Sequence, residues 1–312
     1  MPSYSGVWTL PAVMQAIGSE NWPSVPPAAI ALFGGGSTTS VFYSNINTLG
    51  NATTFGTLTG PNSATGVAAS STRAVFASGT SSISYTTFAT TGSFTNFGNF
   101  SVTHGGYTAG MSSSTRGVFG GGQPSALINV LDYITIATTG NAIDFGDNAT
   151  TFGYAGGCAS PTRGVFAGGL TGAGYDYSAA IKYITIATTG NTSSFGDLTF
   201  SQSWPTSSCS NATRGLFAGG NSGAGVINSI DYITIATTGN GTDFGDLYAG
   251  NASTAMAAST TRALFAGGEL DAGATNTIAY VTIASTGNTT DFGDLPTAST
   301  YQTGCSATHG GI

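Results

Sequence analysis

One stretch decides the fold of this chain: Asp231-Tyr-Ile-Thr-Ile-Ala-Thr-Thr-Gly-Asn-Gly-Thr-Asp-Phe-Gly-Asp-Leu247, a pattern that occurs six times. In every copy a Tyr stands twelve residues before a Phe, and a Gly follows that Phe. The pairs are Tyr43 with Phe55, Tyr85 with Phe97, Tyr133 with Phe145, Tyr183 with Phe195, Tyr232 with Phe244, and Tyr280 with Phe292. A fixed interval repeated along a chain indicates one supersecondary unit that has been copied.

Each copy is expected to form two strands and a tight turn. The first strand begins at Tyr232, where large and small residues alternate with β-branched ones, as a pleated surface favours. Gly239 and Asn240 suit the turn, because both residue types accept a positive φ angle. The second strand runs through Phe244. No apolar period of 3.6 residues is present, which argues against helix.

A second set of Phe residues predicts two further strands in each unit. They stand at intervals of 43, 43, 47, 51 and 48 residues, each in a short strand that ends in small residues. The members of this set are Phe33, Phe76, Phe119, Phe166, Phe217 and Phe265. A strand of small residues precedes each of these Phe strands from the second copy on, which gives four strands in roughly 40–50 residues, the period of a β-propeller blade.

The repeat resembles the kelch repeat, in which a strand ending in Gly-Gly is followed by a Tyr strand and then by an aromatic residue. Phe244 stands where kelch repeats usually have Trp. The resemblance implies an all-β fold, a six-bladed kelch-like β-propeller of four-stranded antiparallel blades. We expect the C-terminal strand, within residues 301–308, to join the Phe33 strand in one blade, because pairing the two chain ends removes free sheet edges.

Two domains are expected, an N-terminal anchoring extension over residues 1–28 and the β-propeller over residues 29–312. The extension lies outside the repeat and carries apolar residues that suit contact with another surface. Those predicted to form the anchor are Trp8, Leu10, Met14 and Trp22.

Composition excludes several classes of partner. Only 6% of the 312 residues are charged, and the net charge is -7 with six basic residues. A basic patch for nucleic acid is therefore not expected. No apolar run approaches the roughly 18 residues that a membrane-spanning helix needs. The N-terminus also lacks the pattern of a secretory signal.

The sequence predicts no cofactor and no metal site. Cys158, Cys209 and Cys305 stand at or next to one repeated position, where a small apolar residue suits a core. No Cys-x-x-Cys spacing is present. Two His residues are too few for a copper site, and the repeated Asp pairs lack the ligand loop of a calcium site.

Five Arg residues and one His are expected at a single repeated position: Arg73, Arg116, Arg163, Arg214, Arg262 and, in the sixth copy, His309. Arginine clusters bind carboxylates and phosphates, and a sialidase is a six-bladed propeller with such a cluster. A sialidase takes its arginines from non-equivalent positions, whereas these are symmetric. We therefore expect each Arg to bond backbone carbonyls or an acidic neighbour between two blades.

Loop lengths vary on the otherwise constant repeat, and variable loops are where binding usually resides. The longest insertion contains Tyr175, Asp176 and Tyr177. Glu269 and Asp271 lie in a second loop, and Trp204 lies in a turn on the same expected face. The hypothesis is that this face contacts a partner or a glycan. The alternative is a set of solvated loops without a ligand.

The start of the chain, Gly6-Val-Trp-Thr-Leu-Pro with Asn21-Trp22-Pro23, resembles virion proteins of tailed bacteriophages, especially those of marine and cyanobacterial hosts. The amino-acid sequence of the repeat also resembles repeats in such virion proteins. The resemblance implies a non-enzymatic structural protein of the virion, in a tail fibre or appendage. Residues 1–28 would bind other virion proteins, and the propeller would contact host surface glycans or neighbouring subunits. The alternatives are a stand-alone, lectin-like glycan-binding propeller and, less favoured, a glycosidase.

Overall fold

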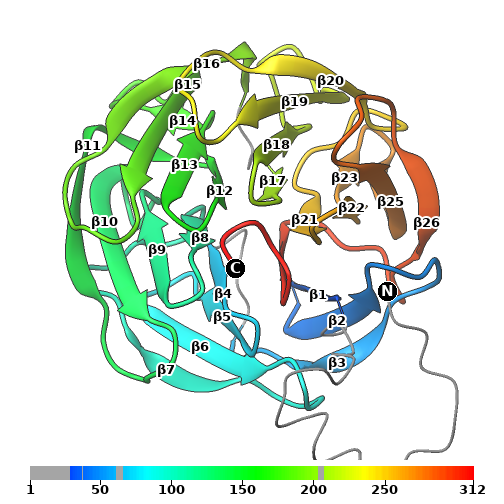
Figure 1. Ribbon diagram of the computed structural model, residues 1–312, viewed down its shortest axis with the longest axis horizontal. Helices are drawn as coiled ribbons and strands as arrows, with labels where there is room; N and C mark the ends of the chain where they lie inside the picture. Colours follow the sequence, from blue (N-terminus) through cyan, green and yellow to red (C-terminus); the bar gives the residue numbers. More distant parts are fainter. Residues whose placement is uncertain (1–28, 37, 61–65, 203–206) are drawn as a thin grey trace, which may run out of the picture.

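The computed structural model describes residues 29–36, 38–60, 66–202 and 207–312, and the regular elements of these residues are all strands (Figure 1). No described helix is long and apolar enough to cross a membrane. The anchor residues Trp8, Leu10, Met14 and Trp22 lie outside the described residues, as does the domain boundary predicted after residue 28.

Four sheets contain four antiparallel strands each, and a nine-stranded sheet contains two more sets of four, joined through the short strand β14 (Leu170–Thr171). We number these six sets in chain order and call each one a sheet. The remaining two strands, β23 (Glu269–Leu270) and β24 (Gly273–Ala274), form a separate hairpin.

The first sheet has the order β27 (Gln302–Ser306), β1 (Ile30–Gly35), β2 (Ser40–Asn45), β3 (Thr53–Thr57). The second has β4 (Val67–Ala69), β5 (Arg73–Ala77), β6 (Ser82–Thr87), β7 (Thr95–Asn99). The third has β8 (Ala109–Ser112), β9 (Arg116–Gly120), β10 (Ile128–Thr135), β11 (Ile143–Gly153).

The fourth sheet has the order β12 (Gly156–Ala159), β13 (Arg163–Ala167), β15 (Asp176–Thr185), β16 (Ser193–Gln202). The fifth has β17 (Ser207–Ser210), β18 (Arg214–Ala218), β19 (Ser229–Thr234), β20 (Thr242–Asp246). The sixth has β21 (Ala255–Ala258), β22 (Arg262–Ala266), β25 (Thr277–Thr282), β26 (Thr290–Asp294).

The strands of small residues lie innermost, around the centre of a propeller-like arrangement (Figure 1). Contacts link them in the cyclic order β4, β8, β12, β17, β21, β27 and back to β4. Small side chains are needed here because each innermost strand contacts the next one closely. The expectation of an all-β fold with four-stranded antiparallel sheets is confirmed.

The two ends of the described chain share the first sheet. β27 pairs antiparallel with β1, and Phe33 lies opposite Gly304. The predicted pairing of the C-terminal strand with the Phe33 strand is therefore confirmed. Without β27, β1 would be the inner edge strand of the first sheet and would expose its backbone.

Apolar cores fill the spaces between neighbouring sheets. One such core contains Val75 of the second sheet and Phe119 of the third, both fully buried. In each sheet the repeated Tyr meets the Phe twelve residues later edge to face, with ring centroids 5.7–6.1 Å apart. This contact explains the constant interval, because the two rings lie on paired strands across one turn.

A backbone contact joins each sheet to the next. The glycine of each turn donates its N–H to the carbonyl of the repeated Phe in the preceding sheet, at 2.7–3.0 Å. The donor–acceptor pairs are Gly92 to Phe55, Gly140 to Phe97, Gly190 to Phe145, Gly239 to Phe195, Gly287 to Phe244 and Gly50 to Phe292. The last pair joins the first sheet to the sixth.

The Gly that follows each Phe is required by this contact. A Cβ on Gly146 would lie 2.5 Å from the carbonyl oxygen of Gly190, which is backbone and cannot rotate away. The equivalent glycines of the other sheets face the same obstacle. A side chain at this position would push neighbouring sheets apart.

We expect Gly146→Ala to lower the free energy of unfolding by about 2 kcal/mol or more, because the new methyl group forces the two backbones apart. Gly140→Ala is the matched control. Its Cβ would meet nothing within 4 Å, and its backbone is not among the left-handed ones. Urea unfolding checks both variants, and equal stability of the two would contradict this account of the contact.

Candidate functional site

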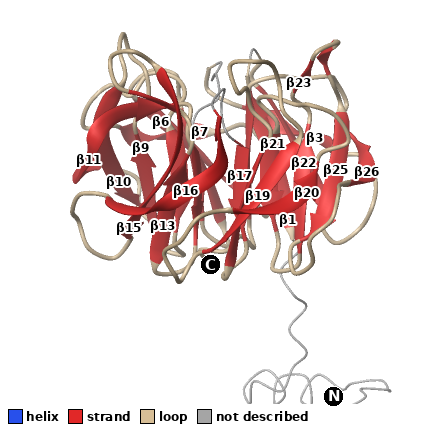
Figure 2. Ribbon diagram, turned by 90° about the horizontal axis from the view of Figure 1, so that it is seen from above, coloured by secondary structure: helices blue, strands red, loops and turns tan. Residues whose placement is uncertain are grey.

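One face of the molecule carries the variable loops, and we call it the loop face. It consists of the loops that follow the second strand of each sheet, together with the turns that lead into the innermost strands. Gly169 N–H donates to the Gln202 carbonyl at 2.7 Å, and Gly268 N–H donates to the Ser299 carbonyl at 2.8 Å. The two kinds of segment therefore share a face, as the sequence predicted. Figure 2 shows β23 on this face and the C-terminus on the opposite one.

The predicted loop residues fall into two groups. Tyr175, Asp176 and Tyr177 lie at the hairpin of β14 and β15 in the fourth sheet, where Asp176 and Tyr177 are exposed. Glu269 and Asp271 lie at the β23–β24 hairpin beside the sixth sheet, so the structure places them apart from the tyrosines. Trp204 lies outside the described residues.

A cluster that sequence reasoning missed surrounds Tyr175. Tyr107 and Tyr154 stack with ring centroids 3.8 Å apart and an interplanar angle of 14°. The Tyr154 hydroxyl donates to Gln123 Oε1 at 2.6 Å, and Gln123 Nε2 donates to the Tyr175 hydroxyl at 3.2 Å. We call these four residues the tyrosine–glutamine cluster. Burial, and then the neighbouring tyrosines Tyr107, Tyr175 and Tyr301, raise the pKa of Tyr154.

These tyrosines have strained backbones. Among the described residues, five that are not glycine have a left-handed backbone, and four of them are Tyr107, Tyr154, Tyr175 and Tyr301 with φ of 56–63°. A bulky residue there is a genuine outlier and points to a functional constraint. One sequence signal could have found three of them, since Tyr107, Tyr154 and Tyr301 each begin a Tyr-x-x-Gly motif.

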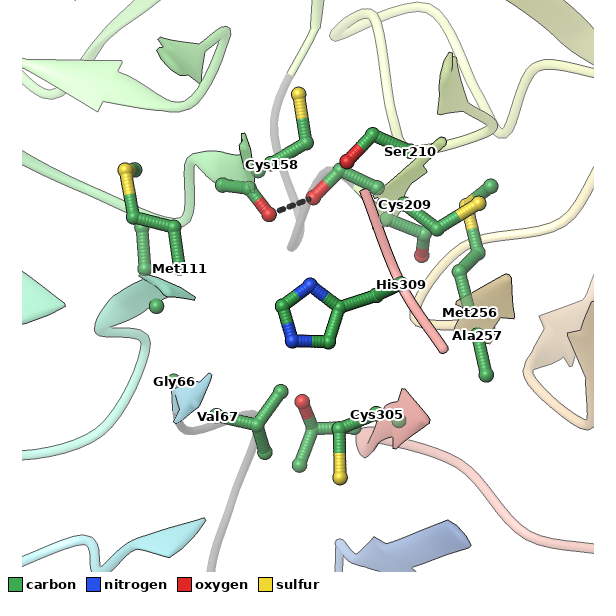
Figure 3. A pocket seen from close by; sticks show the side chains of 18 of the residues that line it. Gly66, Val67, Met111, Cys158, Cys209, Ser210, Met256, Ala257, Cys305 and His309 are labelled. Atoms are coloured by element: carbon green, nitrogen blue, oxygen red, sulfur yellow. Dashed lines mark hydrogen bonds between the residues drawn. The ribbon is translucent and has the colours of Figure 1, made fainter. Parts of the chain in front are cut away.

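A pocket of about 110 Å³ runs along the centre, between the innermost strands (Figure 3). Small residues line most of it, so backbone and short side chains form the wall. The Ser112 hydroxyl accepts from Ala69 N–H and donates to the Ala69 carbonyl, both at 2.9 Å. Ser210 makes the same pair of bonds to Ala159. These hydroxyls satisfy the backbone groups at the edges of the innermost strands.

His309 is not at the sixth copy of the arginine position, and that prediction is wrong. It lies in the central pocket (Figure 3), where Nε2 is 3.0 Å from the Ala69 carbonyl and Nδ1 accepts from Gly311 N–H at 3.0 Å. Desolvation lowers the pKa of His309 to about 4, so the ring is neutral at pH 7 and carries its proton on Nε2. The reason is topological. In the other sheets the arginine begins the second strand, but in the first sheet the second strand is β1, from the other end of the chain. Its first residue, Ile30, therefore occupies the arginine position.

The five arginines lie between sheets. Each donates Nη1 to one or two backbone carbonyls of the next sheet at 2.7–3.0 Å. Each guanidinium also lies 4.4–4.8 Å above the ring of the repeated Tyr in its own sheet. The sequence suggested backbone carbonyls or acidic side chains as acceptors, and the acceptors in the structure are backbone carbonyls. The arginines therefore act between sheets and do not converge on a site.

His104 and Asp132 form a buried polar pair, which the exposed Ser101 also bonds. Ser101 donates both its N–H and its hydroxyl to the Asp132 carboxylate, at 2.8 and 2.6 Å. His104 Nε2 lies 3.2 Å from Asp132 Oδ2, and His104 Nδ1 lies 2.7 Å from the Gly121 carbonyl. A nucleophilic serine must bond the histidine, whereas Ser101 bonds the carboxylate, so the arrangement is not a catalytic triad.

The cysteines have the expected role. Cys158, Cys209 and Cys305 are free and buried in the cores between sheets, and burial raises the pKa of each thiol. Within the described part of the chain, no group of three or more His, Cys, Asp or Glu residues could hold a metal ion.

No protein-family model matches the chain, and the comparison with curated proteins found no match. The solved structure of YjhT is similar to this chain with a TM-score of 0.65 and 10% sequence identity. The match covers 78% of this chain and 87% of that chain. Similarity at this identity shows the fold and says nothing about activity.

We expect Asp132→Asn to lower the free energy of unfolding at pH 7 by about 3 kcal/mol, because it replaces a buried carboxylate that accepts hydrogen bonds from Ser101 and contacts His104. Burial acts to raise the pKa of Asp132, but the bonds from His104 and Ser101 outweigh it and lower the pKa. The stabilisation that the charged Asp132 gives the wild-type protein is thus fully present above the pKa of this carboxyl in the unfolded state. It is lost as the pH falls through the folded-state value, so the difference between the proteins should shrink below about pH 4.

Asp231→Asn is the control, since Asp231 occupies the equivalent position of the fifth sheet. Burial raises the pKa of Asp231 in spite of the bonds from Thr199, so its charge already costs stability. The substitution should change stability by less than about 1 kcal/mol. Chemical unfolding between acidic and neutral pH checks both variants, and an equal loss in both would refute the role of His104.

Proposed function

We propose that the six sheets are the blades of a closed, kelch-like β-propeller, and that the protein is a non-enzymatic component of a tailed-phage virion. In this proposal residues 1–28 bind other virion proteins. The loop face is displayed outward from a tail fibre or appendage, toward the host surface or a neighbouring subunit.

Interactions at every boundary between sheets support the closed propeller. The turn glycines donate to the preceding sheet at all six boundaries, including Gly50 of the first sheet to Phe292 of the sixth. Arg262 of the sixth sheet donates to the Ile46 carbonyl of the first sheet at 2.9 Å. The same contacts that join the other sheets thus also join the last to the first.

The single observation that carries the display function is the position of Ala29. In the first sheet Ala31 pairs with Ser306 and Gly35 pairs with Gln302. Ala29 therefore lies at the end where β27 finishes, opposite the loop face. A segment that continues from Ala29 starts on the face away from Tyr301 and the variable loops. Anchoring at one face and binding at the other is what a displayed module needs.

The assignment to a virion rests on two resemblances to phage proteins, that of the N-terminal sequence and that of the repeat sequence. The tail fibre or appendage position extends the same resemblance. The non-enzymatic interpretation is supported by where the polar groups are used: the arginines bond backbone between sheets, and His104 pairs with Asp132 inside the protein.

A stand-alone glycan-binding propeller is the second candidate. The tyrosine–glutamine cluster favours it, because half-buried aromatic rings joined by an amide suit a polar ligand with an apolar face. A glycosidase is less favoured, since it would need two carboxylates flanking one bond. The described acidic loop residues Asp176 and Glu269 lie beside different sheets.

We expect a chain that begins at Ala29 to fold with unchanged cooperativity and to be absent from particles, because the anchor is removed and the sheets are intact. Mass spectrometry of particles assembled with tagged full-length or shortened protein checks the prediction. Tyr177→Ser in the full chain is the control, since it alters the opposite face and should still enter particles. Incorporation of the shortened chain, or its failure to fold, would overturn the anchor.

A further inference from the structure

We propose that the tyrosine–glutamine cluster and the adjacent mouth of the central pocket bind a neutral saccharide unit. This inference deepens the proposed function, because it names the ligand class and the residues on the displayed face.

The tyrosine–glutamine cluster lies directly beside the central pocket. The residues that directly follow Tyr107, Tyr154 and Tyr301, which are Thr108, Ala155 and Gln302, all line the central pocket. The three tyrosines therefore lie beside the pocket at its loop-face end. His309 and the C-terminal residues lie at its other end, where Gly310 N–H donates to the Ser210 carbonyl at 2.8 Å.

Two buried polar side chains lack hydrogen-bond partners, one in the pocket wall and one directly before the pocket-lining Thr254. Gln302 is 3% exposed, and neither its amide oxygen nor its amide nitrogen has a hydrogen-bond partner. The hydroxyl of Ser253, which is 1% exposed, also lacks a partner. Unpaired polar groups in a protein interior are costly, and a ligand with hydroxyl groups would satisfy an amide that can both donate and accept.

The aromatic part of the site suits the rest of a sugar. A pyranose ring has a face of C–H groups and a rim of hydroxyls. Tyrosine rings offer an apolar face to the former and a hydroxyl to the latter. Gln123 fixes the hydroxyls of Tyr154 and Tyr175, so the rings are held in place before a ligand arrives. Preorganisation of this kind lowers the entropic cost of binding.

Charge argues for a neutral ligand. Of the six basic residues, five are arginines that start the second strands, at the ends of the sheets away from the loop face. The sixth, Lys182, lies within β15. Asp176, the described charge next to Tyr175 in the chain, disfavours an anionic sugar. The pocket volume of 110 Å³ is small beside ligand pockets of about 300–1,000 Å³, so only a substituent of the sugar fits inside.

The test is binding of glucose, galactose, N-acetylglucosamine and N-acetylgalactosamine to the full chain, by saturation-transfer NMR and calorimetry. N-acetylneuraminic acid is the charged comparator. We expect at least one neutral sugar to bind and the charged sugar to bind at least about tenfold more weakly. Absence of binding by all four neutral sugars, or preference for the charged one, would overturn the proposal.

Two variants locate the site without relying on unfolding. Tyr107→Gly removes a ring of the stack and relieves a left-handed backbone, so the variant should remain folded and lose binding about tenfold or more. Gln302→Met replaces an unpartnered amide by an apolar chain of similar length. It should raise the melting temperature of the free protein and weaken binding. Unchanged affinity in both variants would place the sugar elsewhere.

Tyr248→Ala is the control for any exposed tyrosine. Tyr248 is 49% exposed, lies outside the cluster and bonds Thr275 at 3.3 Å, so its removal should leave affinity unchanged. The two proposals fail separately. Sugar binding by a protein that is absent from particles refutes the virion function alone, whereas presence in particles without sugar binding refutes the saccharide site alone.

Discussion

The close approach of two backbones at each boundary between sheets is the constraint on which the structure depends. A turn glycine donates to the carbonyl of the repeated Phe, and the Gly after that Phe leaves room for the contact. The Asn of the same turn adds a second bond, as when Asn191 Oδ1 accepts from Asp147 N–H at 2.9 Å. Backbone contacts have little freedom to adjust, so the interval between Tyr and Phe is the same in every copy.

The arginines add a second contact at five of the six boundaries. A planar guanidinium can donate to carbonyls in the next sheet while its face lies on a Tyr ring, which a lysine could not do as well. The boundary between the first and second sheets shows what replaces it. Ile30 stands at the arginine position and packs in one core with Phe88, which stands where every other sheet has Ile. Apolar packing of Ile30 and Phe88 thus takes the place of the hydrogen bonds that an arginine makes at the other boundaries.

The two faces of the molecule differ in how their polar groups are satisfied. At the end where β27 finishes, His309 and Gly310 bond the backbone of innermost strands, and His309 lines the pocket. At the loop face, strained tyrosines surround a buried amide without a partner. Strain and unsatisfied groups cost stability, so their concentration at one mouth is the physical basis for placing a ligand there.

The sequence alone determined the repeated strands, the number of four strands in each sheet and the buried Phe positions. It also determined the pairing of the Phe33 strand with the C-terminal strand. All of these follow from a local pattern that occurs in six copies, so an ambiguous element in one copy can be assigned from the equivalent residues of the others. Tertiary structure alone decided the tyrosine–glutamine cluster, because Tyr107, Gln123, Tyr154 and Tyr175 come from different loops whose paths no repeat specifies. It also decided the place of His309, because the strand expected after it comes from the other end of the chain. Local periodicity encodes contacts within a unit, whereas contacts between loops depend on backbone conformations that residue types do not reveal.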